Sequence, residues 1–285
     1  MNTTPIFESE TAGLQRDQYY WEKHLADELR LETQTEWLQY SREHYAEWVR
    51  MYLKGGGRVL KTDAFEEIRG REVVDALLER FSQVVVADLA LPGLRQGARL
   101  HADRGLSWVQ APAQVQPYAD GSFDAVTSFS TLDHFQTVRE IGDSLRELAR
   151  ITRPGGQLLI TLDNASNPLL AMRNVIPNGL LQRLGLAPYE YGKTLNASGF
   201  RSVLAETGWV VREFTAVVHA PRVLAVAAAR YCGQNRWLTP ALYRKLLRPC
   251  ELLEKAPTHL WTGYFLLALA ERESDAAMCQ GRRSL

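Results

Sequence analysis

Several features that many proteins rely on are scarce in this chain of 285 residues. It has three cysteines, at positions 232, 250 and 279, which are too few and too widely separated for a disulfide framework or a zinc site. Lys and Arg number 33, as do Asp and Glu, so no net charge attracts nucleic-acid phosphates or an anionic membrane. No apolar run is long enough to span a bilayer. These scarcities disfavour a nucleic-acid partner and a secreted, disulfide-bonded protein.

The first ten residues, MNTTPIFESE, also lack the apolar core of a signal peptide. Together with the few cysteines, this predicts a cytoplasmic protein without a membrane span.

A more local scarcity concerns glycine after the first predicted strand, RVLKTDAF at 58–65, because no glycine appears there until Gly70. The glycines at 55–57 precede the strand, where they predict a turn, whereas a ligand-binding loop has to follow it. The missing G-x-G-x-x-G argues against a nicotinamide-dependent dehydrogenase.

Three short, β-branched apolar runs between residues 84 and 165 form the centre of the sequence. Each ends on small or polar residues, which is typical of parallel strands covered by helices on both faces. Ligands of such sheets lie at the carboxyl ends of the strands. The candidate positions are therefore Asp88, the segment 128–134, and the pair Asp163 and Asn164.

Four motifs occur in a characteristic order. Asp88 closes one strand, P-Y-A-D-G-S-F-D spans 117–124, S-F-S-T-L-D-H spans 128–134, and R-P-G-G spans 153–156. In this order and at these spacings the chain resembles the class I S-adenosylmethionine (SAM)-dependent methyltransferases of the small-molecule branch, over roughly residues 55–270.

The resemblance implies an α/β, Rossmann-like, doubly wound sheet of seven mostly parallel strands, with N-terminal and inserted helices forming a lid. We expect an N-terminal arm and aromatic helices over 1–53 and a SAM-binding core over 54–165. An acceptor-site insertion with the last strands and a helical cover would occupy 166–273, and a polar tail 274–285. The aromatic stripe within 17–53 predicts helices packed on the sheet, with one or two aromatics also lining the pocket.

The resemblance also implies SAM as the cofactor. Asp88 would accept hydrogen bonds from the two ribose hydroxyls, because its two oxygens can each serve one of them. Gln114 or the main chain would contact the adenine amino group, and Leu89 and Ala113 are further cofactor-binding candidates. Ser128 and Phe129 would lie beside the ligand.

The loop at 61–67 departs from the family pattern, because Asp63, Phe65 and Glu67 stand where small residues are expected. One explanation is a variant loop in which Asp63 holds the SAM ammonium and Lys61 or Thr62 its carboxylate. The other is that the SAM site has decayed. We prefer the first, because the other strand ends keep their polar residues.

For catalysis, His134 is placed to take a proton from the attacking group, although it is equally compatible with packing on a loop. Asn164 and Tyr189 would contact the acceptor. Asp133 is expected to cap the next helix and Asp124 to be structural. His219 is a second candidate base, although we favour a satisfied edge histidine. No metal site is predicted.

The resulting hypothesis is methyl transfer from SAM to O, N or C of a small organic acceptor. One alternative is a SAM-using enzyme of another reaction type, cyclisation or aminocarboxypropyl transfer, which would release methylthioadenosine. The other is a non-catalytic binding subunit. The acceptor and the oligomeric state are not determined by the sequence.

Overall fold

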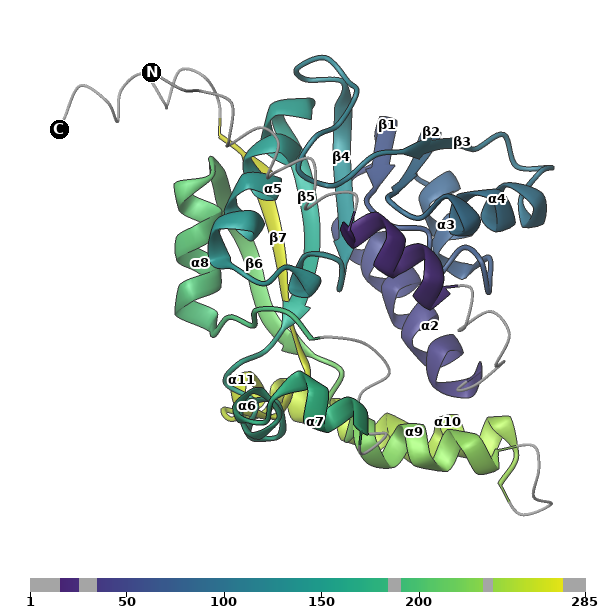
Figure 1. The fold of residues 1–285 in the computed structure, drawn as a ribbon, viewed down its shortest axis with the longest axis vertical. Helices are drawn as coiled ribbons and strands as arrows, with labels where there is room; N and C mark the ends of the chain where they lie inside the picture. The colour runs from purple at the N-terminus through teal and green to yellow at the C-terminus, as the bar shows by residue number, and fades with distance from the viewer. Residues whose placement is uncertain (1–15, 26–34, 184–190, 233–237, 274–285) are drawn as a thin grey trace, which may run out of the picture.

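The computed structural model describes residues 16–25, 35–183, 191–232 and 238–273 (Figure 1). Seven strands form one sheet in the order β3-β2-β1-β4-β5-β7-β6. Their bounds are β1 Gly56–Lys61, β2 Phe81–Asp88, β3 Ser107–Gln110, β4 Phe123–Phe129, β5 Thr152–Asp163, β6 Trp209–Val217 and β7 Phe265–Arg272. Strands β1 to β5 pair in parallel, and β7 runs antiparallel to both β5 and β6. The predicted fold class is confirmed.

The strand order reverses between β1 and β4, which lie side by side. In open α/β sheets this reversal opens a crevice at the carboxyl ends of the strands, since the connections leave in opposite directions. The fold therefore positions a ligand site next to the ends of β1, β2 and β4.

Helices cover both faces of the sheet because alternate strand residues point to opposite sides. Val59 of β1 belongs to the apolar cluster of α2 (Thr35–Tyr52) and α3 (Glu72–Leu78). Its neighbour Leu60 belongs to the cluster of α5 (Val138–Ile151) and α8 (Ala197–Glu206). Helix α4 (Leu91–Leu100) connects β2 to β3. This two-sided burial explains the continuous apolar strand sequences.

Helix α5 begins at a capping box formed by Thr137 and Glu140. The Thr137 side chain accepts a hydrogen bond from the Glu140 N–H, and the Glu140 carboxylate accepts one from the Thr137 N–H. The expectation that Asp133 caps this helix was therefore wrong. Asp133 lies instead in a short 3-10 helix, η1 (Leu132–His134), and is buried.

The aromatic stripe of α2 packs on the sheet as predicted. Trp37, Tyr45 and Trp48 are buried, and the Tyr45 ring stacks on Phe129 with centroids 4.6 Å apart. Trp37 and Tyr45 also line the cavity described below, so these two aromatics serve both purposes.

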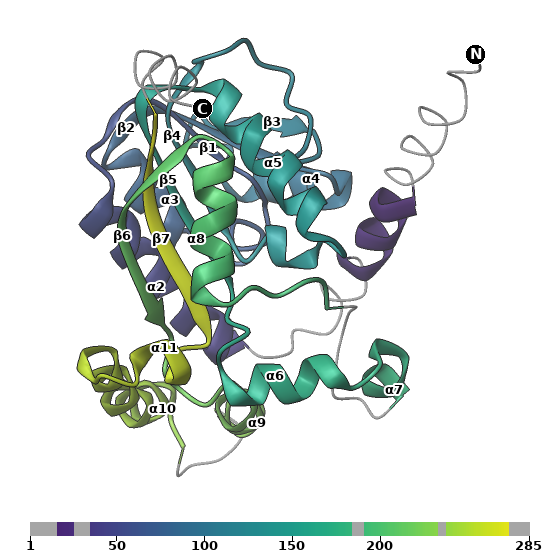
Figure 2. The ribbon, with the colours of Figure 1, turned by 90° about the vertical axis from the view of Figure 1, so that its left-hand side faces the viewer.

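A group of helices lies at the carboxyl ends of β4 and β5, below the sheet in Figures 1 and 2. The members are α6 Pro168–Val175, α7 Asn178–Arg183, α9 Arg222–Tyr231, α10 Pro240–Leu247, the 3-10 helix η2 Arg248–Lys255, and α11 His259–Thr262. Within the described residues, no helix combines the length and the apolar character needed to cross a membrane.

Candidate active site

A cavity of about 1210 Å³ opens where the carboxyl ends of β1, β2 and β4 meet. Its walls come from segments far apart in the sequence, including helical residues 16–25, α2, α6 and α9. The cavity lies where the strand order reverses and is large enough for a cofactor together with a small acceptor.

Asp88, at the end of β2, lies in the wall of this cavity. Its Oδ1 accepts a hydrogen bond from the Ala90 N–H at 2.7 Å, and its Oδ2 accepts one from the Ala64 N–H at 2.8 Å. Each oxygen keeps a further acceptor position, since a carboxylate oxygen has two lone pairs. Burial raises the pKa of Asp88 to about 6, so the group is ionised at neutral pH.

Three other predicted cofactor residues lie near Asp88 in the cavity wall. Leu89 follows it directly, while Ala113 and Gln114 follow β3. This end of the cavity therefore combines apolar surface with the Asp88 carboxylate and the Gln114 amide.

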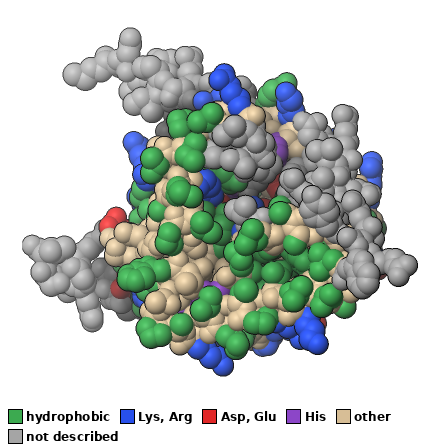
Figure 3. All heavy atoms as spheres, turned by 90° about the horizontal axis from the view of Figure 1, so that it is seen from below, with side chains coloured by type: hydrophobic (Ala, Val, Ile, Leu, Met, Phe, Trp, Pro, Cys, Tyr) green, Lys and Arg blue, Asp and Glu red, His purple; other side chains and the backbone are tan. Residues whose placement is uncertain are grey.

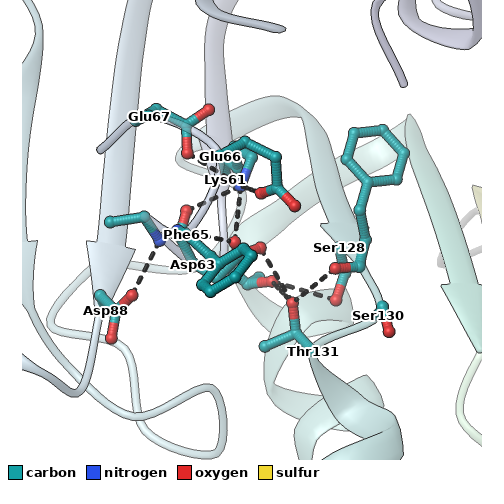
Figure 4. Close-up of polar contacts among 12 residues, drawn as sticks. Lys61, Asp63, Phe65, Glu66, Glu67, Asp88, Ser128, Ser130 and Thr131 are labelled. Carbon is teal, nitrogen blue, oxygen red and sulfur yellow. Dashed lines mark hydrogen bonds and ion pairs between the residues drawn. The ribbon is translucent and has the colours of Figure 1, made fainter. Parts of the chain in front are cut away.

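Lys61, at the end of β1, does not reach the cavity. Its side chain is fully buried, and its Nζ lies 2.8 Å from Asp63 Oδ1, 2.7 Å from Glu66 Oε2 and 3.0 Å from Glu67 Oε2. Figure 4 shows the three acidic side chains converging on this ammonium group. The prediction that Lys61 contacts the SAM carboxylate is corrected, because its donors are occupied by the protein's own acids.

The protons of this cluster are unevenly distributed. Burial, reinforced by the charge of Asp63, holds the pKa of Glu66 well above its usual range. Burial alone would also raise the pKa of Asp63, but the Lys61 ammonium and several hydrogen bonds lower it. The acids are therefore pulled in opposite directions: the pKa of Asp63 is lowered and that of Glu66 is raised. Asp63, Glu66 and Glu67 have the spacing of metal ligands, but the cation that they bind is the Lys61 ammonium.

Two hydroxyls connect this loop to β4. The Asp63 Oδ2 accepts a hydrogen bond from the Thr131 Oγ at 3.0 Å, and the Thr62 hydroxyl lies 3.0 Å from that of Ser128. Thr62 and Asp63 line the cavity, whereas Ser128 is buried outside its wall. Ser128 thus supports Thr62 from behind instead of contacting a ligand, which corrects its predicted role.

Phe65 also lines the cavity, where a glycine-rich loop would leave only backbone. The Arg69 guanidinium lies over its ring, 4.4 Å from the centroid. The loop after β1 therefore presents side chains to the ligand space.

His134 and Phe129 line the part of the cavity next to β4, as predicted. The His134 ring packs against that of Trp21, with centroids 4.5 Å apart. Burial lowers the pKa of His134 to about 4, so the imidazole is neutral at pH 7. A neutral imidazole has a ring nitrogen that can accept a proton.

Two arginines in the cavity wall were not among the predicted site residues: Arg173 was not considered, and Arg222 was expected only in a cover over the pocket or an oligomer face. Arg173 of α6 forms an ion pair with Asp163 at 2.7 Å and lies over the Tyr191 ring, 3.9 Å from its centroid. Arg222 of α9 donates a hydrogen bond to the Tyr264 hydroxyl at 2.6 Å. Of these residues, Arg173, Tyr191, Arg222 and Tyr264 line the cavity, whereas Asp163 does not.

Two predicted acceptor residues have other outcomes. Asn164 is buried and donates hydrogen bonds to the carbonyls of Leu260 and Gly263, so it fixes the chain near α11 and does not contact an acceptor. Tyr189 lies outside the described residues.

His219 is buried, and its ring nitrogens are hydrogen-bonded to Thr262 and Ala216. This confirms the prediction that its hydrogen-bonding groups are satisfied within the protein.

Comparisons with known proteins agree with this geometry. Residues 70–160 match a family described as a methyltransferase domain. The chain is 35% identical over 121 residues to a ubiquinone/menaquinone biosynthesis C-methyltransferase of Serratia proteamaculans, covering 36% of this chain and 46% of the relative. It is 28% identical over 139 residues to the mitochondrial 2-methoxy-6-polyprenyl-1,4-benzoquinol methylase of Xenopus laevis, which covers 47% of this chain and 43% of the relative. The chain thus spans less than half the length of these curated relatives.

Solved structures share the fold at low sequence identity. A geranyl diphosphate methyltransferase in complex with SAM has a TM-score of 0.53 and 16% identity, covering 81% of this chain and 85% of that one. The [4+2]-cyclase SpnF has a TM-score of 0.52 and 17% identity, and the match covers 81% of this chain and 80% of SpnF. Residues 70–160 therefore match a methyltransferase domain, and the fold of the chain is the one shared by class I SAM-dependent methyltransferases. The resemblance found in the sequence is confirmed.

SAM is the cofactor of this class, and its adenosine fits the half of the cavity that contains Asp88. The spare acceptor positions of Asp88, beside Leu89, Ala113 and Gln114, suit an adenosine. The half near β1 differs, because Asp63, Phe65 and Glu66 replace a bare backbone. An ammonium group is compatible with Asp63, whose carboxylate remains ionised.

Proposed function

We propose that this chain is a SAM-dependent methyltransferase acting on O, N or C of a small organic acceptor. The observation that carries the proposal is one continuous cavity with Asp88 at its cofactor end and a neutral, half-buried His134 in its wall. Thr62, Asp63, Asp88, Leu89, Ala113, Gln114 and Phe129 would hold the cofactor.

Bound SAM supplies an electrophilic methyl group, and the protein's own contribution is to orient the acceptor and to accept its proton. His134 is positioned to take that proton. Arg173 and Tyr264 supply hydrogen-bond donors for orientation, while Trp21 and Phe129 restrict water.

The names of the relatives suggest which acceptors to test first. They describe methylation of benzoquinol and menaquinone precursors. We infer that hydroxylated aromatic rings are the most informative first acceptors for this chain. We also propose a cytoplasmic location, because three widely separated cysteines are too few for the disulfide framework of a secreted protein.

The loop with Asp63, Phe65 and Glu66 favours a second candidate, a SAM-using enzyme of another reaction type. A methionine group held by side chains instead of backbone would present a different carbon of the sulfonium to the acceptor. The [4+2]-cyclase among the structural neighbours has this fold and a name that describes no methyl transfer.

Product analysis separates the two candidates. The full chain would be incubated with SAM and a panel of hydroxylated aromatic acceptors, and the nucleoside products resolved by chromatography. Methyl transfer yields S-adenosylhomocysteine and a methylated acceptor, whereas the alternative yields methylthioadenosine.

Isothermal titration tests whether the loop takes part in binding. We expect micromolar affinity for SAM, equivalent to about 8 kcal/mol, and a loss of at least about tenfold in Asp63→Ala. An unchanged affinity in that variant would contradict the role of Asp63. A wild-type chain that binds neither SAM nor S-adenosylhomocysteine would refute both enzymatic candidates.

A further inference from the structure

Exposed apolar side chains are concentrated on the helices below the sheet. Of the 16 large hydrophobic side chains exposed in the described part of the chain, ten lie on these helices. We call them the lower face: Leu169, Met172, Val175, Leu180, Leu224, Leu242, Leu246, Leu252, Leu253 and Trp261. Figure 3 shows hydrophobic side chains gathered on this side of the molecule. Exposed apolar surface of this extent marks an interaction site.

The same helices expose more positive than negative charge. Among the described side chains of α6, α7, α9, α10, η2 and α11, four basic residues are exposed, Arg183, Lys245, Arg248 and Lys255, against one exposed acid, Glu254. Figure 3 shows Lys and Arg side chains along the edge of the apolar region.

We propose that the lower face docks on an anionic phospholipid bilayer. Apolar side chains on short helices, bordered by Lys and Arg, are the features of helices that lie in a membrane interface without crossing it. The apolar side chains would enter the acyl boundary, and the long cationic side chains would reach the headgroups.

The lower face also continues into the active-site cavity. Leu169 and Met172 of α6 are 50% and 63% exposed, and both line the cavity. Arg173 follows directly on the same helix. In a docked molecule, the part of the cavity next to α6 would therefore face the lipid. An apolar acceptor could then pass along α6 between the bilayer and the cavity.

Charge favours a bilayer over a second copy of the chain as the occupant. A two-fold dimer would bring two identical faces together, and each face has the same excess of positive charge. Such a contact is repulsive, whereas an anionic headgroup layer is attractive.

Vesicle co-sedimentation of the full chain tests this proposal without requiring catalysis. We expect binding to vesicles of phosphatidylcholine with a minority of phosphatidylglycerol, weaker binding to phosphatidylcholine alone, and loss of binding at high salt. The double variant Leu246→Ser, Trp261→Ser should lower the partition coefficient by about tenfold or more. Both side chains are exposed, at 60% and 64%, and neither lines the cavity.

The matched control is Met51→Ser with Val115→Ser, which removes side chains that are 69% and 60% exposed on other parts of the surface. It should bind vesicles like the wild type. Brominated lipid should quench wild-type tryptophan fluorescence more than that of Trp261→Phe.

Three results would overturn the proposal: no binding to either vesicle, equal loss in the control variant, or a dimer in sedimentation equilibrium that the Leu246 and Trp261 substitutions dissociate while vesicles are ignored. The proposed methyl transfer would stand or fall separately, on product analysis.

Discussion

Asp88 is half-buried in the cavity wall, and its pKa of about 6 makes ligand binding sensitive to pH. Burial favours the neutral form, so Asp88 is ionised above about pH 6 and protonated below it. Protonation removes acceptor capacity for ribose hydroxyls. We therefore expect the affinity for S-adenosylhomocysteine to fall by about tenfold between pH 7.5 and pH 5, as measured by isothermal titration.

The variant Asp88→Asn provides the control for this titration. It should bind at least about tenfold more weakly at pH 7.5, and its affinity should not change further toward pH 5. The exposed Asp103→Asn should behave like the wild type. A wild-type affinity that stays constant with pH would show that Asp88 does not contact the ligand.

His134 predicts an unusual pH profile for the chemical step. A base with the ordinary histidine pKa loses activity below about pH 6.5. Because burial lowers the pKa of His134 to about 4, its base form persists, and kcat should stay constant down to about pH 5 and fall only toward pH 4.

The substitution His134→Gln should reduce kcat by about 10²-fold or more if the attacking group has to lose a proton. His259→Gln, in a half-buried histidine distant in the sequence, serves as the control. A kcat profile that breaks near pH 6.5 and survives His134→Gln would assign the base to another group.

At the scale of elements, the turn after β1 is stabilised by the buried Lys61 ammonium and the acids Asp63, Glu66 and Glu67. Removing one partner of a buried ionic network leaves uncompensated charge. We expect Lys61→Met to lower the free energy of unfolding by about 3 kcal/mol or more at pH 7, as measured by urea denaturation.

This loss should depend on pH in a defined direction. Without Lys61 the folded-state pKa values of Glu66 and Glu67 rise further above their unfolded values. The folded state then binds more protons, so its stability decreases as pH increases. The destabilisation should therefore be larger at pH 8 than at pH 6. Lys54→Met, in a pair whose lysine side chain is 74% exposed, should change stability by less than about 1 kcal/mol.

Elements were predicted more reliably than the directions of their side chains. The segment expected as a helix at 136–151 forms α5 from Val138, because Thr137 and Glu140 provide a local capping box. The same reasoning assigned Asp133 as the cap, since Asp and Thr are both good N-caps and spacing alone does not choose between them. For Asp133, burial next to Ser130 decided the outcome.

At the scale of the whole molecule, ligand binding should stabilise the fold. A ligand present at about 100 times its Kd adds about 2.7 kcal/mol to the free energy of unfolding. For a chain of this size we expect S-adenosylhomocysteine to raise Tm by about 5 °C, as measured by differential scanning fluorimetry. Adenosine should give part of this shift and methionine almost none, because the adenosine contacts follow the usual pattern. The absence of a shift with S-adenosylhomocysteine would favour decay of the cofactor site.

The sequence by itself determined the sheet, the order of its motifs and the strand ends where Asp88 and His134 lie. These properties are local: a doubly buried strand has to be apolar throughout, and a polar residue at its end marks the edge of the core. Only the tertiary structure decided that Lys61 turns inward, that Asn164 fixes the chain near α11, and that Arg173 and Tyr264 meet His134 around one cavity. It also revealed a cationic lower face within a neutral chain. Each of these outcomes depends on contacts and charges brought together from distant segments, which neither composition nor periodicity records.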